Sequence, residues 1–367
     1  MNKILLCSPY EIGEDNNAGG IAIWTQNIMA EYRLKTNRPI HVDLISTSRK
    51  IFISKDTSVF KRLFSGAREY SIIIKKIKQQ IKQNNYDCLH LSSSGSVSLF
   101  KDYLILKFAA KRGIKTYIHF HFGRIPTIIK QKGWEYKMLM KVCNLTYKTI
   151  VMDSNSLVDL EREGIGNVVF LPNPVSADVA EALATKGDVT RQNNRILFVG
   201  HVSEKKGIFE LIDACSQIKN IELIVIGKVE LNVQNEIEAR WPNAKWLHIL
   251  GTMPHGQVVK EMLKCGIFVL PSYTEGFPNV ILEAMACSCP IISTSVGAIP
   301  EMLAAQEKNK CGIVIPPKNI NALKSALDNL LADNGLAKKL SCNAILKVNL
   351  EYSSQKIFNR LCEIWSK

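Results

Sequence analysis

Two glutamates in the second half of the chain, Glu275 and Glu283, have a residue type and spacing that suit the binding of one polar ligand. Eight positions separate them, which corresponds to about 12 Å of rise along a helix. Carboxyl pairs that cleave a glycosidic bond lie about 5 to 9.5 Å apart, so hydrolysis by this pair is not expected. The spacing instead favours one extended polar ligand that is held at both ends.

The residues around these glutamates predict a strand, a sharp loop and the start of a helix. The apolar run Gly266–Leu270 is typical of a buried strand, and Pro271 ends it. After the loop Glu275-Gly276-Phe277-Pro278, Asn279 can cap a helix. Free amides and the helix dipole make a helix start an anion site, so we expect a phosphate between the glutamates. The alternative is a capping loop glutamate and a solvent-facing helix glutamate.

Two further strand-to-helix junctions have residues suited to phosphate. Lys205-Lys206-Gly207 follows the expected strand Arg195–Val199, where a lysine places a point charge beside a diphosphate. Gly19 and Gly20 follow the first expected strand, where glycine allows close backbone approach. The alternatives are a surface lysine pair and a plain tight turn.

Histidines and cysteines give no metal-site pattern. His119 and His121 share one face of an expected strand, and His121 lies nearer the strand end, so it is the better active-site candidate. No third ligand follows nearby, and the chain has no D-x-D pair, so no metal or other cofactor is expected. The ten cysteines are scattered without a C-x-x-C motif, which favours reduced, buried thiols.

The positive charge lies mainly in the first half. The chain of 367 residues has a net charge of +14, of which the first 175 residues carry +12. Basic and apolar residues interleave from Lys55 to Lys82, which suits an anionic membrane surface or acceptor, or else a solvated helix face on a sheet. Few aromatics interleave there and no nucleic-acid motif occurs, so nucleic acid is not expected as a partner.

No apolar run reaches the roughly 18 residues that span a bilayer. The N-terminal run Ile4–Cys7 is too short for the core of a signal peptide. We therefore expect a cytoplasmic protein that is soluble or peripheral on the inner face of the cell membrane.

Strand and helix patterns alternate along the chain, which predicts an α/β fold with two doubly wound, Rossmann-like domains. In the first half the expected strands are Lys3–Ser8, Ile40–Ile45, Asp87–Leu91, Lys115–His121, Thr149–Met152 and Val168–Leu171. In the second half they are Arg195–Val199, Ile221–Ile226, Ala244–Ile249, Gly266–Leu270, Pro290–Thr294 and one near Gly312–Ile315. We expect domains at 1–175 and 195–350, a linker at 176–194 and a final helix within 351–367. Two such domains that face each other form a ligand cleft at the carboxyl ends of both sheets.

These motifs together resemble the retaining glycosyltransferases of family 4, which have the GT-B fold. The resemblance is most specific from Glu275-Gly276-Phe277-Pro278-Asn279 through Glu283-Ala284-Met285-Ala286 to Val296-Gly297-Ala298-Ile299-Pro300-Glu301. Gly19-Gly20, Pro172-Asn173-Pro174 and the loop Gly200–Gly207 follow in the order typical of the family. The resemblance covers nearly the whole chain.

The resemblance implies transfer of a sugar from a nucleoside diphosphate sugar with retention of configuration and without a metal. The acceptor would be a glycan or a lipid-linked oligosaccharide of a surface polysaccharide, lipopolysaccharide or capsule, bound by the first domain. The final helix would pack back on that domain.

The resemblance also implies roles for individual residues. Glu283 would hold the ribose hydroxyls, and Glu275 with the amides near Gly276 and Phe277 would hold the transferred sugar. Lys206 and the amides around Asn279 and Val280 would stabilise the departing diphosphate. His121 would contact the donor sugar near the reacting carbon.

His201 departs from the family pattern, which usually has an arginine directly after the strand-end glycine. A histidine carries at most a partial charge near neutral pH, and Lys205 is the residue placed to compensate. This departure keeps a non-catalytic sugar-nucleotide sensor as an alternative. Another reaction on the same fold, epimerisation or phosphorolysis, is a second alternative.

Overall fold

The computed structural model describes residues 2–10, 19–35, 40–48, 59–176, 179, 183 and 189–366, with side chains in the helix 59–83 described from residue 68 onward. The chain divides into two compact units, residues 1–172 with 358–367, and residues 173–357. About half of the expected linker 176–194 lies outside the described residues. The basic segment that begins at Lys55 lies outside them up to position 58, and none of its side chains is described before residue 68.

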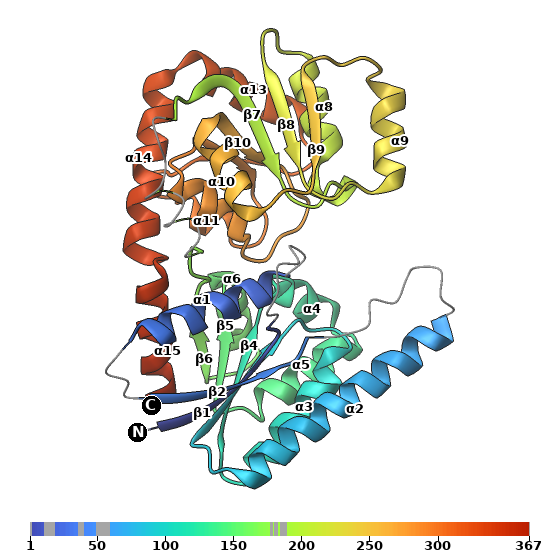
Figure 1. Cartoon of the computed structure of the whole chain (residues 1–367), viewed down its shortest axis with the longest axis vertical. Coiled ribbons are helices and arrows are strands. Elements are labelled where there is room, and N and C mark those ends of the chain that lie inside the picture. Colours follow the sequence, from blue (N-terminus) through green and yellow to red (C-terminus); the bar gives the residue numbers. More distant parts are fainter. Residues whose placement is uncertain are drawn as a thin grey trace. The chain divides into compact units, whose positions relative to one another are not determined.

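The first unit contains a six-stranded sheet in the order β2-β1-β3-β4-β5-β6, in which every pairing is parallel (Figure 1). Its strands are β1 (Asn2–Ser8), β2 (Ile40–Ser46), β3 (Cys88–Ser93), β4 (Lys115–Phe120), β5 (Lys148–Val151) and β6 (Val168–Phe170). Its helices are α1 (Gly20–Leu34), α2 (Val59–Gln83), α3 (Ser98–Ala110), α4 (Ile125–Gln131), α5 (Trp134–Cys143) and α6 (Ser154–Arg162). Apart from His90, the buried residues of β1 and β3 are apolar or small, as expected of central parallel strands that are covered on both faces.

The second unit repeats this plan with a sheet in the order β12-β11-β10-β7-β8-β9 (Figure 1). Its strands are β7 (Gln192–Val199), β8 (Glu222–Ile226), β9 (Leu247–Gly251), β10 (Cys265–Leu270), β11 (Ile291–Thr294) and β12 (Ile313–Ile315). Its helical elements are the short η1 (Glu204–Lys206), α8 (Ile208–Ser216), α9 (Leu231–Arg240), α10 (His255–Lys264), α11 (Asn279–Ala286), α12 (Ile299–Met302), α13 (Ile320–Ala332) and α14 (Asn334–Glu351).

The expected starts of two strands are wrong. Sequence pattern placed one at Arg195, whereas β7 begins at Gln192, inside the expected linker 176–194. It placed the other at Ala244, whereas β9 begins at Leu247. Asn243 has a left-handed backbone with φ of 65°, and the Leu247 amide donates to the Ala244 carbonyl at 3.0 Å. A turn therefore occupies the residues that the apolar pattern had assigned to the strand.

The last helix, α15 (Ser354–Ser366), contains the boundary between the two units. Its residues from Phe358 onward belong to the first unit, where the Arg360 guanidinium donates to the Phe170 carbonyl at 3.0 Å. Trp365 is 2% exposed, and its indole Nε1 donates to His90 Nδ1 at 3.1 Å. The end of the chain is therefore part of the core of the first unit.

Topology explains where functional loops gather. In the second sheet β7 lies between β10 and β8, so the strand order reverses beside β7. Ligands of open α/β sheets bind at such a reversal, outside the carboxyl ends of the strands. The loops that follow β7 and β10 are the ones with the lysine pair and with Glu275.

Candidate active site

Lys206 and Glu275 meet at the carboxyl edge of the second sheet. Lys206 Nζ donates to Glu275 Oε1 at 2.6 Å, and the side chains are 30% and 10% exposed. The Tyr273 amide also donates to the Lys205 carbonyl at 2.9 Å, which joins the two loops through the backbone. The structure thus brings together two residues that are 69 positions apart and that the sequence assigned to one site.

Two glycines allow these loops to approach. Gly207 has φ of +71°, and a Cβ there would lie 2.1 Å from the Pro271 carbonyl oxygen. Gly297 has φ of +55°, and a Cβ there would lie 2.4 Å from the carbonyl oxygen of Glu275. Real Cβ atoms essentially never come within 3.0 Å, so both positions require glycine for the loops to meet as they do.

The expected cap at Asn279 is wrong. Pro278 occupies the N-cap position of α11, and Asn279 is the first helical residue. Its Oδ1 accepts instead from Asn173 Nδ2 at 2.9 Å, and no side chain caps this helix. The backbone amides of Asn279 and Val280 therefore stand at a helix start that is positive and uncapped, next to Glu275 in sequence.

The loop before α11 is held by its neighbours. The Gly276 carbonyl accepts from the Ala298 amide at 2.9 Å. The buried Phe277 ring packs edge-on against Tyr352 with centroids 5.7 Å apart. These contacts fix the position of the Glu275 backbone.

Glu283 is 7% exposed, and its partner was missed from the sequence. His255 Nε2 lies 3.3 Å from Glu283 Oε1. His255 begins α10, and nothing in its sequence surroundings indicates that it would reach a glutamate on α11. A buried carboxylate held by a half-buried histidine is an acceptor for ligand hydroxyls.

His201 and Lys205 lie in the same loop but make other contacts. His201 Nε2 is 3.0 Å from Glu230 Oε1, and its side chain is 46% exposed. Lys205 is exposed. The structure therefore pairs His201 with the residue that precedes α9, while Lys206 is the cation bonded to Glu275.

His121 belongs to a buried aromatic cluster in the first unit. Its ring centroid lies 3.9 Å from that of His119 and 4.9 Å from that of Trp24. His90 completes the cluster with a centroid 5.5 Å from that of His119. Within the described part of the chain, neither ring nitrogen of His119 nor Nε2 of His121 has a hydrogen-bond partner.

Burial keeps these imidazoles neutral. Desolvation lowers the pKa of His90 and that of His121 to about 3, and the pKa of His119 falls well below its usual range for the same reason. At neutral pH His121 can therefore donate or accept a hydrogen bond, but it is not a general acid. Among the described residues no three His, Cys, Asp or Glu side chains are arranged to hold a metal ion.

Gly19 and Gly20 lie at the start of α1, and both are exposed. Gly19 is the N-cap with φ of −67°, and a Cβ there would meet no atom of the described chain within 4 Å. Gly19 thus begins a helix at a position where the described residues do not require glycine, and the close backbone approach expected of this pair stays a prediction.

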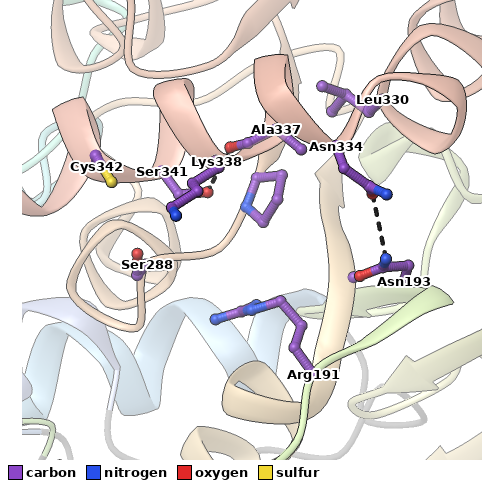
Figure 2. A pocket seen from close by; sticks show the side chains of 11 residues that line it. Arg191, Asn193, Ser288, Leu330, Asn334, Ala337, Lys338, Ser341 and Cys342 are labelled. Carbon is purple, nitrogen blue, oxygen red and sulfur yellow. Dashed lines mark hydrogen bonds between the residues drawn. The ribbon is translucent and has the colours of Figure 1, made fainter.

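A pocket of about 510 Å³ lies elsewhere in the second unit, as Figure 2 shows. Arg191 and Asn193 line one side and Asn334 and Lys338 of α14 the other, and Gly266 is also part of the lining. Arg191, Asn193 and Gly266 stand at the amino ends of β7 and β10, the opposite edge of the sheet from Lys206 and Glu275. Arg191 is already bonded to backbone carbonyls, including that of Cys287 at 2.8 Å, so this pocket is not the expected phosphate site.

Comparison with known proteins agrees with this geometry. Residues 181–347 match the family model "Glycosyl transferases group 1". The matched residues all lie in the second unit. The fold is that of the GT-B glycosyltransferases, with two doubly wound α/β units, as the sequence predicted.

Curated relatives match about half of the chain. An uncharacterized glycosyltransferase of Methanocaldococcus jannaschii is 35% identical over 164 residues, 44% of each chain. A capsular polysaccharide biosynthesis glycosyltransferase of Staphylococcus aureus is 29% identical over 176 residues, 45% of this chain and 43% of the relative. An N,N'-diacetylbacillosaminyl-diphospho-undecaprenol alpha-1,3-N-acetylgalactosaminyltransferase of Campylobacter jejuni is 25% identical over 60% of this chain and 57% of the relative. The matches thus span about half the length of these relatives.

Solved structures match the whole chain. A sucrose-phosphate synthase from Thermosynechococcus elongatus superposes with a TM-score of 0.75 at 19% identity, covering 100% of this chain and 98% of that one. An Anabaena protein in complex with UDP-glucose superposes with a TM-score of 0.68 at 17% identity, covering 99% of both chains. At these identities the likeness concerns the fold.

Proposed function

We propose that the protein transfers a sugar from a nucleoside diphosphate sugar to a glycan or lipid-linked acceptor, with retention of configuration and without a catalytic metal. The observation that carries the proposal is the Lys206–Glu275 pair at 2.6 Å beside the uncapped start of α11. It combines a cation, a carboxylate and free amides, which are the groups that bind a diphosphate next to a sugar.

The ion pair suggests how the donor binds. Without a ligand, Lys206 and Glu275 neutralise each other. A diphosphate would compete for the ammonium group of Lys206, and the carboxylate of Glu275 would then be free to accept hydroxyls of the sugar. Each charge would keep a partner throughout, so the buried carboxylate would not be left unpaired.

The reaction itself requires stabilisation of the leaving group. As the bond from the sugar to the diphosphate breaks, negative charge grows on the phosphate oxygens, and Lys206 with the amides of Asn279 and Val280 would stabilise it. The departing phosphate oxygen would take the proton of the acceptor hydroxyl. Glu283 would hold the ribose hydroxyls, and neutral His121 would hydrogen-bond the donor sugar.

The relatives support the substrate classes. One solved relative binds UDP-glucose, and curated relatives act in capsule synthesis or on a diphospho-undecaprenol sugar. These support a nucleoside diphosphate sugar as donor and a surface polysaccharide precursor as acceptor.

The proposal is tested by turnover. The protein is incubated with a panel of nucleoside diphosphate sugars and lipid extracts, and release of nucleoside diphosphate is measured with and without each extract. We expect acceptor-dependent release that persists with EDTA. Release that needs no acceptor would indicate hydrolysis or another GT-B reaction and would contradict the proposal.

The pairing of His201 with Glu230 favours one second candidate, a non-catalytic sugar-nucleotide sensor. A histidine held by a glutamate offers a diphosphate less positive charge than an arginine would. Saturable donor binding without turnover across the acceptor panel is the result expected of a sensor.

A further inference from the structure

Helix α3 exposes an apolar stripe on the surface of the first unit. Val97, Phe100 and Leu104 follow at spacings of three and four residues, so they lie on one face. Phe100 is 50% exposed and Leu104 is 48% exposed. The opposite side of α3 is fully buried at Leu99 and Leu106, so the helix is apolar on both faces although only one is covered.

An aromatic pair extends this stripe onto α5. The Trp134 ring stacks on Phe100 with centroids 5.8 Å apart and an interplanar angle of 12°, yet Trp134 is 51% exposed. Helix α3 contacts both α2 and α5, so it lies between them on this side of the first unit (Figure 1). A contiguous exposed aromatic patch on a soluble protein marks a docking surface.

Basic side chains continue the same helix faces. Lys107 and Lys111 follow Leu104 along α3 and its C-terminal end, and both are exposed. Lys137 and Lys141 follow Trp134 along α5 at spacings of three and four residues and are also exposed. On the neighbouring helix α2, Lys75 and Lys76 are also exposed.

The acidic residues of α3 and α5 do not offset this charge. Asp102 is fully buried and bonded to Lys101 at 2.8 Å. Glu135 is bonded to Arg124 at 2.6 Å, and it also accepts from the Ser96 amide. The exposed charge of these two helices is therefore positive.

We propose that this surface, the aromatic and apolar stripe of α3 and α5 with its lysines, docks on an anionic lipid bilayer. Aromatic and aliphatic side chains flanked by lysines match the interface of a membrane with negative head groups. A second copy of the chain would place these lysines against one another, and the like charges disfavour that contact. The inference rests on the proposed function in one respect: docking would bring the enzyme to a lipid-linked acceptor.

The test is co-sedimentation with vesicles, which needs no turnover and so can succeed or fail independently of glycosyl transfer. We expect the full chain to bind vesicles of phosphatidylcholine with phosphatidylglycerol, and to bind pure phosphatidylcholine much less. Binding should weaken as salt rises from 0.05 to 0.5 M, since the Debye length at ~0.1 M is about 10 Å. A lysine near an anionic surface contributes about 1 kcal/mol, so Lys107→Gln with Lys111→Gln should weaken binding about 25-fold.

Variants separate docking from general stickiness. Trp134→Ser should weaken binding at least tenfold. In the unchanged chain, vesicles should shift the fluorescence of the exposed Trp134 to the blue, and Trp134→Phe should bind the vesicles without that shift. Leu231→Ser, at a residue 74% exposed in the second unit, and Lys245→Gln are matched controls that should bind as the unchanged chain does. Equal binding to neutral and anionic vesicles, or equal loss in the controls, would overturn the proposal. So would Trp134-dependent self-association without vesicle binding, which would assign the surface to a second copy.

Discussion

Gly297 packs against the backbone of the loop that contains Glu275. Replacing Gly297 with alanine tests whether this close packing sets the position of Glu275. The added Cβ would lie 2.4 Å from the carbonyl oxygen of Glu275 and 2.6 Å from that of Gly276. Because real Cβ atoms stay beyond 3.0 Å, the loop must retreat by about 0.6 Å or more. The retreat also strains the bond from the Ala298 amide to the Gly276 carbonyl.

The expected cost can be built from its parts. Left-handed backbone costs an alanine about 1 to 2 kcal/mol, and a lost hydrogen bond costs about 0.5 to 1.5 kcal/mol. The sum, about 1.5 to 3.5 kcal/mol, should lower Tm by roughly 3 to 14 °C for a unit of this size. A displacement near 1 Å costs about 100-fold in rate, so turnover should fall far more than stability does.

Gly251→Ala is the matched control. Gly251 has φ of +70°, but a Cβ there would meet no described atom within 4 Å. It should therefore lose about 1 to 2 kcal/mol from backbone strain alone, with turnover unchanged. Thermal unfolding and nucleoside diphosphate release are measured for both variants. Equal turnover in Gly297→Ala and Gly251→Ala would refute the argument that Gly297 sets the position of Glu275.

Three other predictions follow from single contacts. Glu275→Gln keeps the hydrogen bond to Lys206 but removes the charge, so turnover should fall about 100-fold or more while Tm stays nearly constant; near-normal kcat/KM would contradict its role as a donor ligand. Trp365→Phe removes the donor to His90 Nδ1 and should lower the free energy of unfolding by about 1 to 3 kcal/mol in urea titration, against no change if the bond is immaterial. Burial depresses the pKa of His90 and of His121 to about 3, so below pH ~6.5 the unfolded chain binds more protons than the folded chain. The free energy of unfolding should therefore fall by about 1.4 kcal/mol per pH unit for each histidine as the pH is lowered from ~6.5 to about 3. A flat profile would show that these rings are protonated in the fold.

The strand, loop and helix around Glu275 could be predicted because their signals are local. An apolar run, a proline and a turn that contains Gly276 together define the junction after β10. The same reasoning predicted the parallel sheets, because strand and helix patterns alternate in both halves. The sequence also assigned Lys206 and Glu275 to one site, but their direct hydrogen bond was not predicted.

Contacts that depend on tertiary packing could not be predicted. Asn279 has the residue type of a cap, but Pro278 takes that position and Asn173 engages the Asn279 side chain. His255 reaches Glu283 from a different helix, and no pattern in the sequence joins them. Tertiary partners decide such side chains, and local propensity does not.

The exposed side of α3 could not be predicted from the sequence either. Phe100 lies in an apolar run that is indistinguishable by pattern from the buried side of α3. Only the packing of α2 and α5 shows which side remains uncovered. The sequence indicated a basic surface around residues 55–82, whereas the structure adds the aromatic stripe beside it.

Calorimetric titration of nucleoside diphosphates tests the central claim most directly. The tightest ligand among UDP, GDP and ADP is compared for the unchanged chain, for Lys206→Met, and for Lys338→Met in the pocket at the opposite edge of the sheet. A hydrogen-bonded charge contributes about 1.5 to 3 kcal/mol, so Lys206→Met should weaken binding about 10- to 150-fold while Lys338→Met leaves it unchanged. Binding that survives Lys206→Met, or that is lost in Lys338→Met, would contradict the assignment of the donor site to Lys206, Glu275 and the start of α11.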